Sequence, residues 1–407
     1  MRQLPSDMSD RRLRILHCSA YFAPAWAFGG PPRSLLALCQ AQAAHGLDLE
    51  VFTTTANPGA PLPASPEGHD VGGVRVRYYP VSPPARLLGA ASMAGPLAEA
   101  MTRADVVHLH GLFNRTVWMA SRLARQARVP VAVSPRGMLQ PAALGHHAWR
   151  KTLTWMLCDR QVVRDAVCVH ATSAMEQAEL ARRFGSGRVV DIPNVVQPVQ
   201  ASSGDVALAR ARVRLPDRAR FILALGRVHP IKRLDLLASA FVSIAARWPD
   251  VHVVVAGPDE AGHWLRVRPR FAPFLSRVHW VGEVDARVKA GLLSDAAMLV
   301  ACSDSESFGM SIAEALSAGT PVVVTETCPW PLIEREACGW WVPQRPSDIA
   351  LAIDRVLLDP AESRTRAAQG RALVAAHFSP AVVSAAWGVV YARLASTRMT
   401  GRPRTAA

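Results

Sequence analysis

The sequence SESFGMSIAEAL, residues 305–316, is the most informative segment of the chain. It follows the apolar run 298–301, reads as a loop that opens a helix, and leads into a second apolar run at 321–325. Gly309 lets the backbone approach a ligand closely, and the free N–H groups and dipole of the first helical turn favour an anion. Strand, loop, helix, strand is the repeating unit of a parallel sheet covered by helices.

The same unit recurs on both sides of this stretch. Short apolar runs separated by helical periodicity predict strands near 13–20, 51–55, 105–109, 129–134 and 166–171, and again near 221–225, 251–256 and 278–281. We therefore predict an α/β protein of two Rossmann-like, doubly wound domains facing each other across a cleft. The expected segments are a disordered tail (1–12), an N-terminal domain (13–195), a linker (196–214), a C-terminal domain (215–378), a helix packing back towards the N-terminal domain (379–395) and a disordered tail (396–407).

Composition sets the outer limits of the function. A chain of 407 residues suits two domains, and its 50% hydrophobic content supplies two cores. The formal charge of +14 suits phosphate ligands, nucleic acid or anionic lipid equally well. Seven scattered cysteines without a C-x-x-C pair indicate neither a disulfide framework nor a zinc site. With no apolar signal core and no run of about 18 apolar residues, we expect a cytoplasmic protein that is soluble or bound to a membrane surface.

A second motif, GRVHPIKRLD at 226–235, also leaves a predicted strand and enters a helix. Arg227 and Lys232 can both reach a diphosphate, the first as a planar fork and the second as a point charge. A solvated basic turn is the alternative. In the first motif, the carboxylates of Glu306 and Glu314 can accept hydrogen bonds from sugar or ribose hydroxyls, or can simply favour the positive end of the helix.

These motifs together resemble the family 4 retaining glycosyltransferases of the GT-B fold, also called bacterial group 1 glycosyltransferases. The resemblance rests on Gly226-Arg227 with Lys232, and on Glu306-x7-Glu314 with Phe308-Gly309 between the two glutamates. It extends through nearly the whole chain, from Leu13 to about Leu394.

The resemblance implies a role for each matching residue. Arg227 and Lys232 would hold the donor's diphosphate, Glu306 would bind hydroxyls of the transferred sugar, and Glu314 would bind the ribose. The remaining donor-binding positions are Gly29 and Gly30 in the N-terminal domain, and Phe308, Gly309, Met310 and Ser311 in the C-terminal domain.

Two more residues of the N-terminal domain are candidates for the site. His110 ends the predicted strand of DVVHLHG, 105–111, and the family match favours it over His108 as a residue near the transferred sugar, although a histidine at a strand end is often structural. Arg136, in SPRGML at 134–139, is either a cleft residue that meets the acceptor or part of a structural turn.

The expected activity is metal-independent hexosyl transfer with retention of configuration. The donor would be a UDP- or GDP-sugar, and the acceptor a glycan or a lipid-linked molecule in bacterial polysaccharide or lipopolysaccharide synthesis. We expect no cofactor and no metal ion, because no Asp-x-Asp lies in a suitable loop to hold a divalent metal. Fixed positive charge opposite the leaving diphosphate would lower the barrier.

The segment 146–164 mixes tryptophan with positive charge and can lie on an anionic membrane surface, as a peripheral protein on the inner face of the plasma membrane would. The alternative is an ordinary helix with its tryptophans in the core. No motif of a nucleic-acid-binding module is present.

Rival functions are a catalytically silent GT-B protein that binds nucleotide or glycan for a partner, and a GT-B sugar epimerase. A dinucleotide-dependent oxidoreductase is weaker still, because no G-x-G-x-x-G follows the first predicted strand.

Overall fold

A computed structural model describes residues 12–140, 148–259 and 261–399. The chain forms two compact units. Unit 1 comprises residues 1–195 and 380–407, and unit 2 comprises residues 196–379.

Unit 1 is built on an eight-stranded sheet with the order β3-β4-β2-β1-β5-β6-β7-β8. All neighbouring strands are parallel except β3 and β4, which form an antiparallel hairpin at the edge. The strands are β1 (Arg14–Ser19), β2 (Asp48–Thr54), β3 (Ser65–Asp70), β4 (Arg75–Tyr79), β5 (Val106–His110), β6 (Val131–Ser134), β7 (Cys168–Ala171) and β8 (Val189–Asp191).

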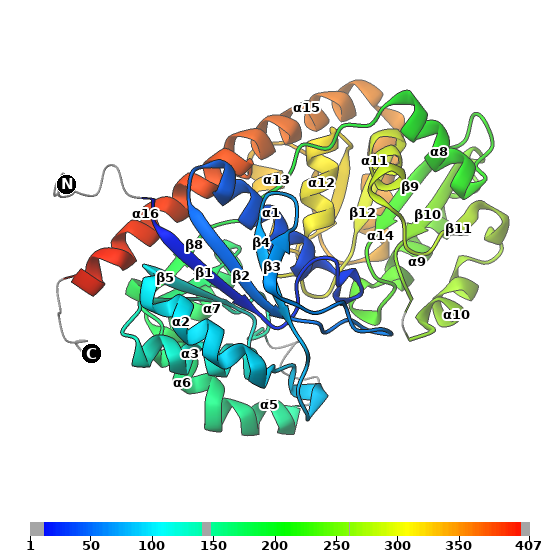
Figure 1. The fold of residues 1–407 in the computed structure, drawn as a ribbon. Helices are drawn as coiled ribbons and strands as arrows, with labels where there is room; N and C mark the ends of the chain where they lie inside the picture. Colours follow the sequence, from blue (N-terminus) through cyan, green and yellow to red (C-terminus); the bar gives the residue numbers. More distant parts are fainter. Residues whose placement is uncertain (1–11, 141–147, 260, 400–407) are drawn as a thin grey trace. The chain divides into compact units, whose positions relative to one another are not determined.

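Helices cover both faces of this sheet (Figure 1). One face packs on α1 (Gly30–Ala44) and α16 (Pro380–Met399), and Trp387 and Tyr391 of α16 are fully buried there. The other face packs on α2 (Ala94–Arg103), α3 (Arg115–Gln126), α6 (Arg160–Asp165) and α7 (Ala174–Phe184). Helix α5 (Ala148–Thr154) and the π-helical turn Trp155–Asp159 precede α6.

Unit 2 is a wholly parallel sheet of six strands with the order β11-β10-β9-β12-β13-β14. The strands are β9 (Arg220–Leu225), β10 (Val251–Ala256), β11 (Val278–Trp280), β12 (Met298–Ala301), β13 (Val322–Thr325) and β14 (Trp340–Val342). The helices are α8 (Ser203–Val213), α9 (Leu234–Ile244), α10 (His263–Val267), α11 (Ala286–Asp295), α12 (Met310–Ala318), α13 (Leu332–Arg335), α14 (Pro346–Leu358) and α15 (Pro360–His377).

Several details differ from the sequence-based expectations. Helix α8 lies inside the expected linker, because Ser202 and Asp205 form a reciprocal capping box. Helix α16 continues through residues 396–399, which we expected to be a tail, while the tail residues 1–11 and 400–407 lie outside the described residues. The hairpin β3–β4 was not predicted, because β3 is mostly exposed and has no apolar run.

One helical run, Pro360–Thr397, is long and apolar enough to cross a membrane by length and composition, whereas the sequence analysis expected no such run. The run joins α15 of unit 2 to α16 of unit 1. Burial of Trp387 and Tyr391 against the sheet of unit 1 accounts for much of the apolar character of α16.

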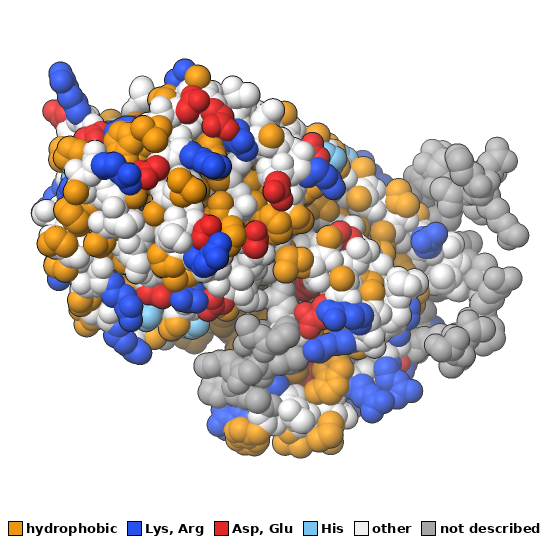
Figure 2. Space-filling model, turned by 180° about the vertical axis from the view of Figure 1, so that it is seen from behind, with side chains coloured by type: hydrophobic (Ala, Val, Ile, Leu, Met, Phe, Trp, Pro, Cys, Tyr) orange, Lys and Arg blue, Asp and Glu red, His pale blue; other side chains and the backbone are white. Residues whose placement is uncertain are grey.

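Basic side chains do not gather into one stripe on the face shown in Figure 2, where they are scattered among acidic and apolar side chains. A continuous basic surface is the usual footprint of nucleic-acid binding. On that face the positive net charge is therefore spread out.

The turn after β9 depends on a close approach between two glycines. Gly257 has a φ of +148°, and a Cβ built there would lie 1.9 Å from the carbonyl oxygen of Gly226. We expect Gly257→Ala to lower the free energy of unfolding by roughly 3 kcal/mol or more, since the neighbouring atom is backbone. Gly204→Ala is the matched control, because its nearest neighbour is the Ser202 Oγ at 3.6 Å in an ordinary helical position. The control should be neutral or stabilising by about 0.5–1 kcal/mol in urea unfolding followed by circular dichroism. Equal stability of the two variants would contradict the expectation.

Candidate functional site

Two loops of unit 2 meet where β9 and β12 end at the carboxyl edge of the sheet, the edge at which open α/β sheets bind ligands. The first loop runs from Gly226 through a short 3₁₀ helix, Pro230–Lys232, into α9. The second runs from β12 to Gly309, which begins α12 with a φ of +83°. A Cβ at Gly309 would lie 2.9 Å from the Ile312 Cδ1, so this position favours glycine for both conformation and space.

An ion pair joins the two loops. The Lys232 Nζ donates to the Glu306 Oε1, and the Ser303 Oγ donates to the same oxygen at 2.9 Å. The Lys232 and Glu306 side chains are 25% and 16% exposed, so the pair is largely shielded from water. A pocket of about 30 Å³ opens beside it, lined by residues that include Gly226, Arg227, Lys232, Glu306 and Ser311.

A second cation holds the same loops together and was missed by the sequence analysis. Arg233, in left-handed conformation with a φ of +51°, pairs with Asp235 at 3.0 Å and with Asp304 at 2.9 Å. The hydrogen bonds that Arg233 donates to Asp235 and then to Asp304 raise the pKa of Arg233. The signal available in the sequence was the Arg-x-Asp spacing directly after Lys232.

Glu314 lies farther along α12 and has its own partner. The Lys289 Nζ of α11 lies 2.7 Å from the Glu314 Oε1, and the two helices pack side by side in Figure 1. Both side chains are partly exposed, at 27% and 19%. Lys289 is therefore a further candidate residue, although its helix carries no motif that would have marked it.

The other donor-binding candidates of unit 2 differ in whether their side chains are buried in the core or line the pocket. The Phe308 side chain is buried against Trp330 and Phe378, and the Phe308 carbonyl accepts a hydrogen bond from the Trp330 Nε1. Met310 packs against the same core, while Ser311 lines the pocket.

The candidates of unit 1 lie at the carboxyl ends of its strands and at the start of α1. Gly29 has a φ of +83°, whereas a Cβ at Gly30 would meet nothing within 4 Å. His110 ends β5, and its Nδ1 lies 3.1 Å from the Arg136 Nη2, so the structure brings these two predicted residues together. The Arg136 Nη1 donates to the Ser34 Oγ, in α1, at 2.8 Å.

His110 belongs to a buried hydrogen-bonded chain, here called the histidine network. The network lies at the carboxyl edge of the unit 1 sheet and includes side chains from α1 and α16. Its members are His17, Gln42, His108, His110, Ser134, His170 and Tyr391.

One proton arrangement satisfies most of this network. Because Arg136 can only donate, the His110 Nδ1 accepts, and the His110 Nε2–H then donates to the His17 Nδ1 at 2.9 Å. The His17 Nε2 and the Gln42 Oε1 are both buried without a hydrogen-bond partner.

The remaining hydrogen bonds of the network run from Gln42 to His170, and the donor and acceptor of each can also be assigned. The Gln42 Nε2 donates to the Tyr391 hydroxyl at 3.0 Å, which donates to the His108 Nδ1 at 2.7 Å. The His108 Nε2 donates to the Ser134 Oγ at 2.7 Å, and Ser134 donates to the His170 Nδ1 at 2.6 Å. The His170 Nε2 ends the chain on the carbonyl oxygen of residue 192 at 2.6 Å. All four imidazoles are therefore neutral and protonated at Nε2.

The same cluster invites comparison with a metal site, since His17, His108 and His110 each offer a ring nitrogen within 4.8 Å of the others. The hydrogen bonds above already occupy these nitrogens, apart from the His17 Nε2. The guanidinium of Arg136 would also repel a cation at this distance. A proton-ordered network accounts for the histidines better than a metal ion does.

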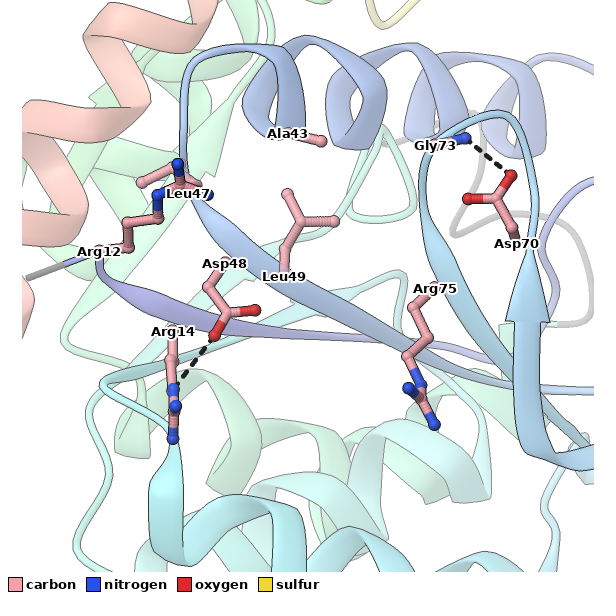
Figure 3. Close-up of a pocket in the computed structure, with 9 residues that line it drawn as sticks. All are labelled: Arg12, Arg14, Ala43, Leu47, Asp48, Leu49, Asp70, Gly73 and Arg75. Atoms are coloured by element: carbon pink, nitrogen blue, oxygen red, sulfur yellow. Dashed lines mark hydrogen bonds and ion pairs between the residues drawn. The ribbon is translucent and has the colours of Figure 1, made fainter.

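A wider hollow lies at the opposite edge of the unit 1 sheet (Figure 3). It has a volume of about 640 Å³ and is lined where β1, β2 and β4 begin. Figure 3 shows Arg14 paired with Asp48, and Asp70 accepting from the backbone of Gly73. Because ligands of such sheets bind at the carboxyl ends of the strands, this hollow is not the candidate site.

Both units match models of known protein families. Residues 29–195 match the family model for the glycosyl transferase 4-like domain, and residues 205–372 match the model for glycosyl transferases group 1. Two Rossmann-like domains with these matches define the class as glycosyltransferase.

Individual relatives agree with this class. The chain is 30% identical to D-inositol 3-phosphate glycosyltransferase 2 of Catenulispora acidiphila over 77% of its length and 78% of the relative's. It is 27% identical to the GDP-mannose:cellobiosyl-diphosphopolyprenol alpha-mannosyltransferase of Komagataeibacter xylinus, over 79% and 77%. The chain belongs to glycosyltransferase family 4, with the GT-B type of fold.

Solved structures show the same fold. HepE of Anabaena, in complex with UDP and glucose, superposes with a TM-score of 0.73 at 17% identity, covering 94% of this chain and all of that one. Sucrose-phosphate synthase of Thermosynechococcus elongatus gives a TM-score of 0.70 at 23% identity, covering 95% and 100%.

The histidine network should make stability depend on pH. Burial lowers the pKa of His17 and of His170 to about 3, and lowers that of His108 and His110 well below 6.5. The unfolded chain therefore binds protons that the folded chain does not, so stability is full above about pH 6.5 and falls as the pH drops towards 3. Between pH 6.5 and 5, His17 and His170 should each cost about 1.7 kcal/mol of stability, and His108 and His110 act in the same direction.

Selective ¹⁵N labelling of histidine tests the protonation states on which this pH dependence of stability rests. Long-range ¹H–¹⁵N spectra at pH 6, assigned residue by residue among the 13 histidines, should show His17, His108, His110 and His170 as neutral Nε2–H imidazoles. Tyr391→Phe should perturb His108 most. Imidazolium signals from these four residues at pH 6 would show the proposed proton arrangement to be wrong.

Proposed function

We propose that this glycosyltransferase transfers a hexosyl group, with retention at the anomeric carbon and without a metal ion, from a UDP- or GDP-sugar to a glycan or lipid-linked acceptor. The observation that carries the proposal is the meeting of Arg227, Lys232 and Glu306 at the carboxyl edge of unit 2, beside the start of α12. Relatives named for GDP-mannose and for D-inositol 3-phosphate, and a neighbour bound to UDP and glucose, support a nucleotide-sugar donor.

The charges suit departure of a nucleoside diphosphate. As the sugar–phosphate bond breaks, negative charge grows on the leaving oxygen, and Lys232 and Arg227 would stabilise it together with the N–H groups of α12. Lys232 must then exchange part of its contact with Glu306 for the phosphate, which frees Glu306 to accept hydrogen bonds from sugar hydroxyls. Glu314 and its partner Lys289 would meet the ribose.

The donor site can be tested by binding alone. We expect one of UDP, GDP or ADP to raise the melting temperature of the purified protein, and Lys232→Met and Glu314→Gln to remove that rise. Loss of one fixed charge or hydrogen bond in such a site lowers kcat by about 10²–10³-fold where turnover is measurable. Lys151→Met is the matched control, since the chain has only two other lysines, Lys232 and Lys289.

The rival functions give different results in the same assay. No rise with any nucleotide would favour a catalytically silent partner protein. Free sugar and nucleoside diphosphate released without an acceptor would favour an epimerase. Activity that EDTA abolishes would contradict metal independence.

We further propose that unit 1 contacts an anionic membrane, as peripheral attachment at the inner face of the plasma membrane in lipopolysaccharide or polysaccharide synthesis would require. Trp149 and Leu157, in α5 and the turn after it, are 69% and 71% exposed, and Met156 is 64% exposed. Trp155 instead packs against Phe184, so the expectation of a core tryptophan holds for only one of the two. His146 and His147 lie outside the described residues.

Positive charge borders these apolar side chains. Arg150 stacks over the Trp149 ring at 5.2 Å, and Arg160 and Arg164 are exposed on the following turns. Figure 2 shows apolar and basic side chains side by side at the lower end of the view, where Figure 1 places α5. Exposed tryptophan and leucine beside arginine suit the interface of an anionic bilayer.

Co-sedimentation with vesicles tests this surface. Trp149→Ser combined with Leu157→Gln should weaken binding to vesicles of phosphatidylglycerol and phosphatidylcholine about tenfold or more, given roughly 1.5–3 kcal/mol for each buried apolar side chain. Leu265→Gln is the control, because Leu265 is 76% exposed but lies in unit 2. Unchanged binding of the double variant would remove the membrane surface from the proposal.

A further inference from the structure

Arg136 carries a positive charge that no acidic side chain neutralises within the described part of the chain. Its guanidinium donates to two neutral acceptors, the Ser34 Oγ and the His110 Nδ1. Its Nε is buried without a hydrogen-bond partner. No carboxylate lies within ion-pair distance of it among the described residues, whereas every other buried or half-buried cation of the site described above is paired with one.

The carboxylate of Glu176 acts on Arg136 electrostatically but is hydrogen-bonded to other groups. Glu176 acts on Arg136 through space, but one of its carboxylate oxygens accepts from the backbone N–H of Gly137. The other accepts from the backbone N–H and the hydroxyl of Thr172. Glu176 thus fixes the loop that carries Arg136 rather than pairing with the guanidinium.

The histidine network contacts Arg136 through the neutral imidazole of His110, so it contributes no negative charge beside the guanidinium. Its imidazoles are neutral in the proton arrangement derived above, so His110 offers Arg136 a lone pair and no negative charge. Ser34 offers a hydroxyl oxygen whose own proton goes to the carbonyl of Pro31. A half-buried guanidinium surrounded only by neutral acceptors is electrostatically unsatisfied.

The backbone also favours a ligand role over a structural one. Arg136 has a φ of +52°, a left-handed conformation that costs a non-glycine residue on the order of 1 kcal/mol. It follows β6 at the carboxyl edge of the sheet, the edge at which ligands of such sheets bind, and it contacts Ser34 in the second turn of α1.

We propose that Arg136 is an anion-binding residue that takes a phosphate or carboxylate oxygen of a ligand, with His110 and Ser34 orienting the guanidinium. The identity of that ligand rests on the proposed transferase function, in which the oxygen belongs either to the donor's diphosphate or to an acidic acceptor. The binding of the anion itself does not depend on that function.

Hydrogen exchange of the full chain, followed by mass spectrometry, tests the site with inorganic phosphate and malonate as probes at constant ionic strength. Either anion should slow exchange in peptides that cover 30–36 and 131–140. Arg136→Gln should remove this protection, corresponding to a Kd at least about tenfold weaker. Arg136→Lys keeps the charge and should keep the protection at a weaker Kd.

Arg128→Gln is the matched control. Arg128 has the same backbone conformation, with a φ of +55°, but precedes β6 at the opposite edge of the sheet. It should leave the protection unchanged. Because removal of an unneutralised charge relieves repulsion, Arg136→Gln should also fold with an undiminished melting temperature; if it does not fold, the comparison of Arg136→Lys with the wild type decides.

The two sources of the anion give different results with UDP and GDP. Weaker nucleotide binding by Arg136→Gln would assign the anion to the donor, and unchanged nucleotide binding with lost phosphate protection would assign it to an acidic acceptor. Phosphate protection that persists in Arg136→Gln, or its absence from the wild type with every anion tried, would overturn the proposal. A wild-type protein that binds phosphate but no nucleotide would instead count against the proposed function alone.

Discussion

The contact between Lys232 and Glu306 is the interaction on which the unit 2 site depends, because it ties the loop after β9 to the loop after β12. Each loop starts where a parallel strand ends, so the sheet brings together residues that are 74 positions apart in sequence. Gly226 and Gly257 allow the backbones beneath to approach, and Arg233 adds a second tie through Asp304. A diphosphate bound here would compete with carboxylates already in place.

The two units differ in the groups that surround their positively charged side chains. Unit 2 pairs Lys232, Arg233 and Lys289 with carboxylates, which stabilises the loops and makes a ligand displace an existing partner. Unit 1 surrounds Arg136 with neutral imidazole and hydroxyl groups, which leaves its charge available. The first arrangement favours a rigid site, and the second favours attraction of an anion at some cost in stability.

Much of the fold could be predicted from sequence because buried parallel strands are short apolar runs between helical segments, and the ranges near β9, β10 and β12 agree closely with the structure. The two motifs of unit 2 that the structure brings together could be named for the same reason, since each stands directly after such a run. Lys289, Gln42 and Tyr391 could not, because their partners are set by helix packing over long sequence separations. Arg136 could be named only as either a cleft residue or part of a turn, because the absence of a carboxylate beside its guanidinium is visible only with its neighbours in three dimensions.

The scarcity of lysine has a practical consequence. Of 46 basic residues only three are lysines, and two of these, Lys232 and Lys289, are bound to the glutamates of the unit 2 site. An amine-directed acylating reagent would therefore have few targets on this chain, and two of the three lysines lie beside the nucleotide-sugar position proposed above. Covalent labelling, read out by intact mass, would then act as a direct gauge of whether that position is occupied.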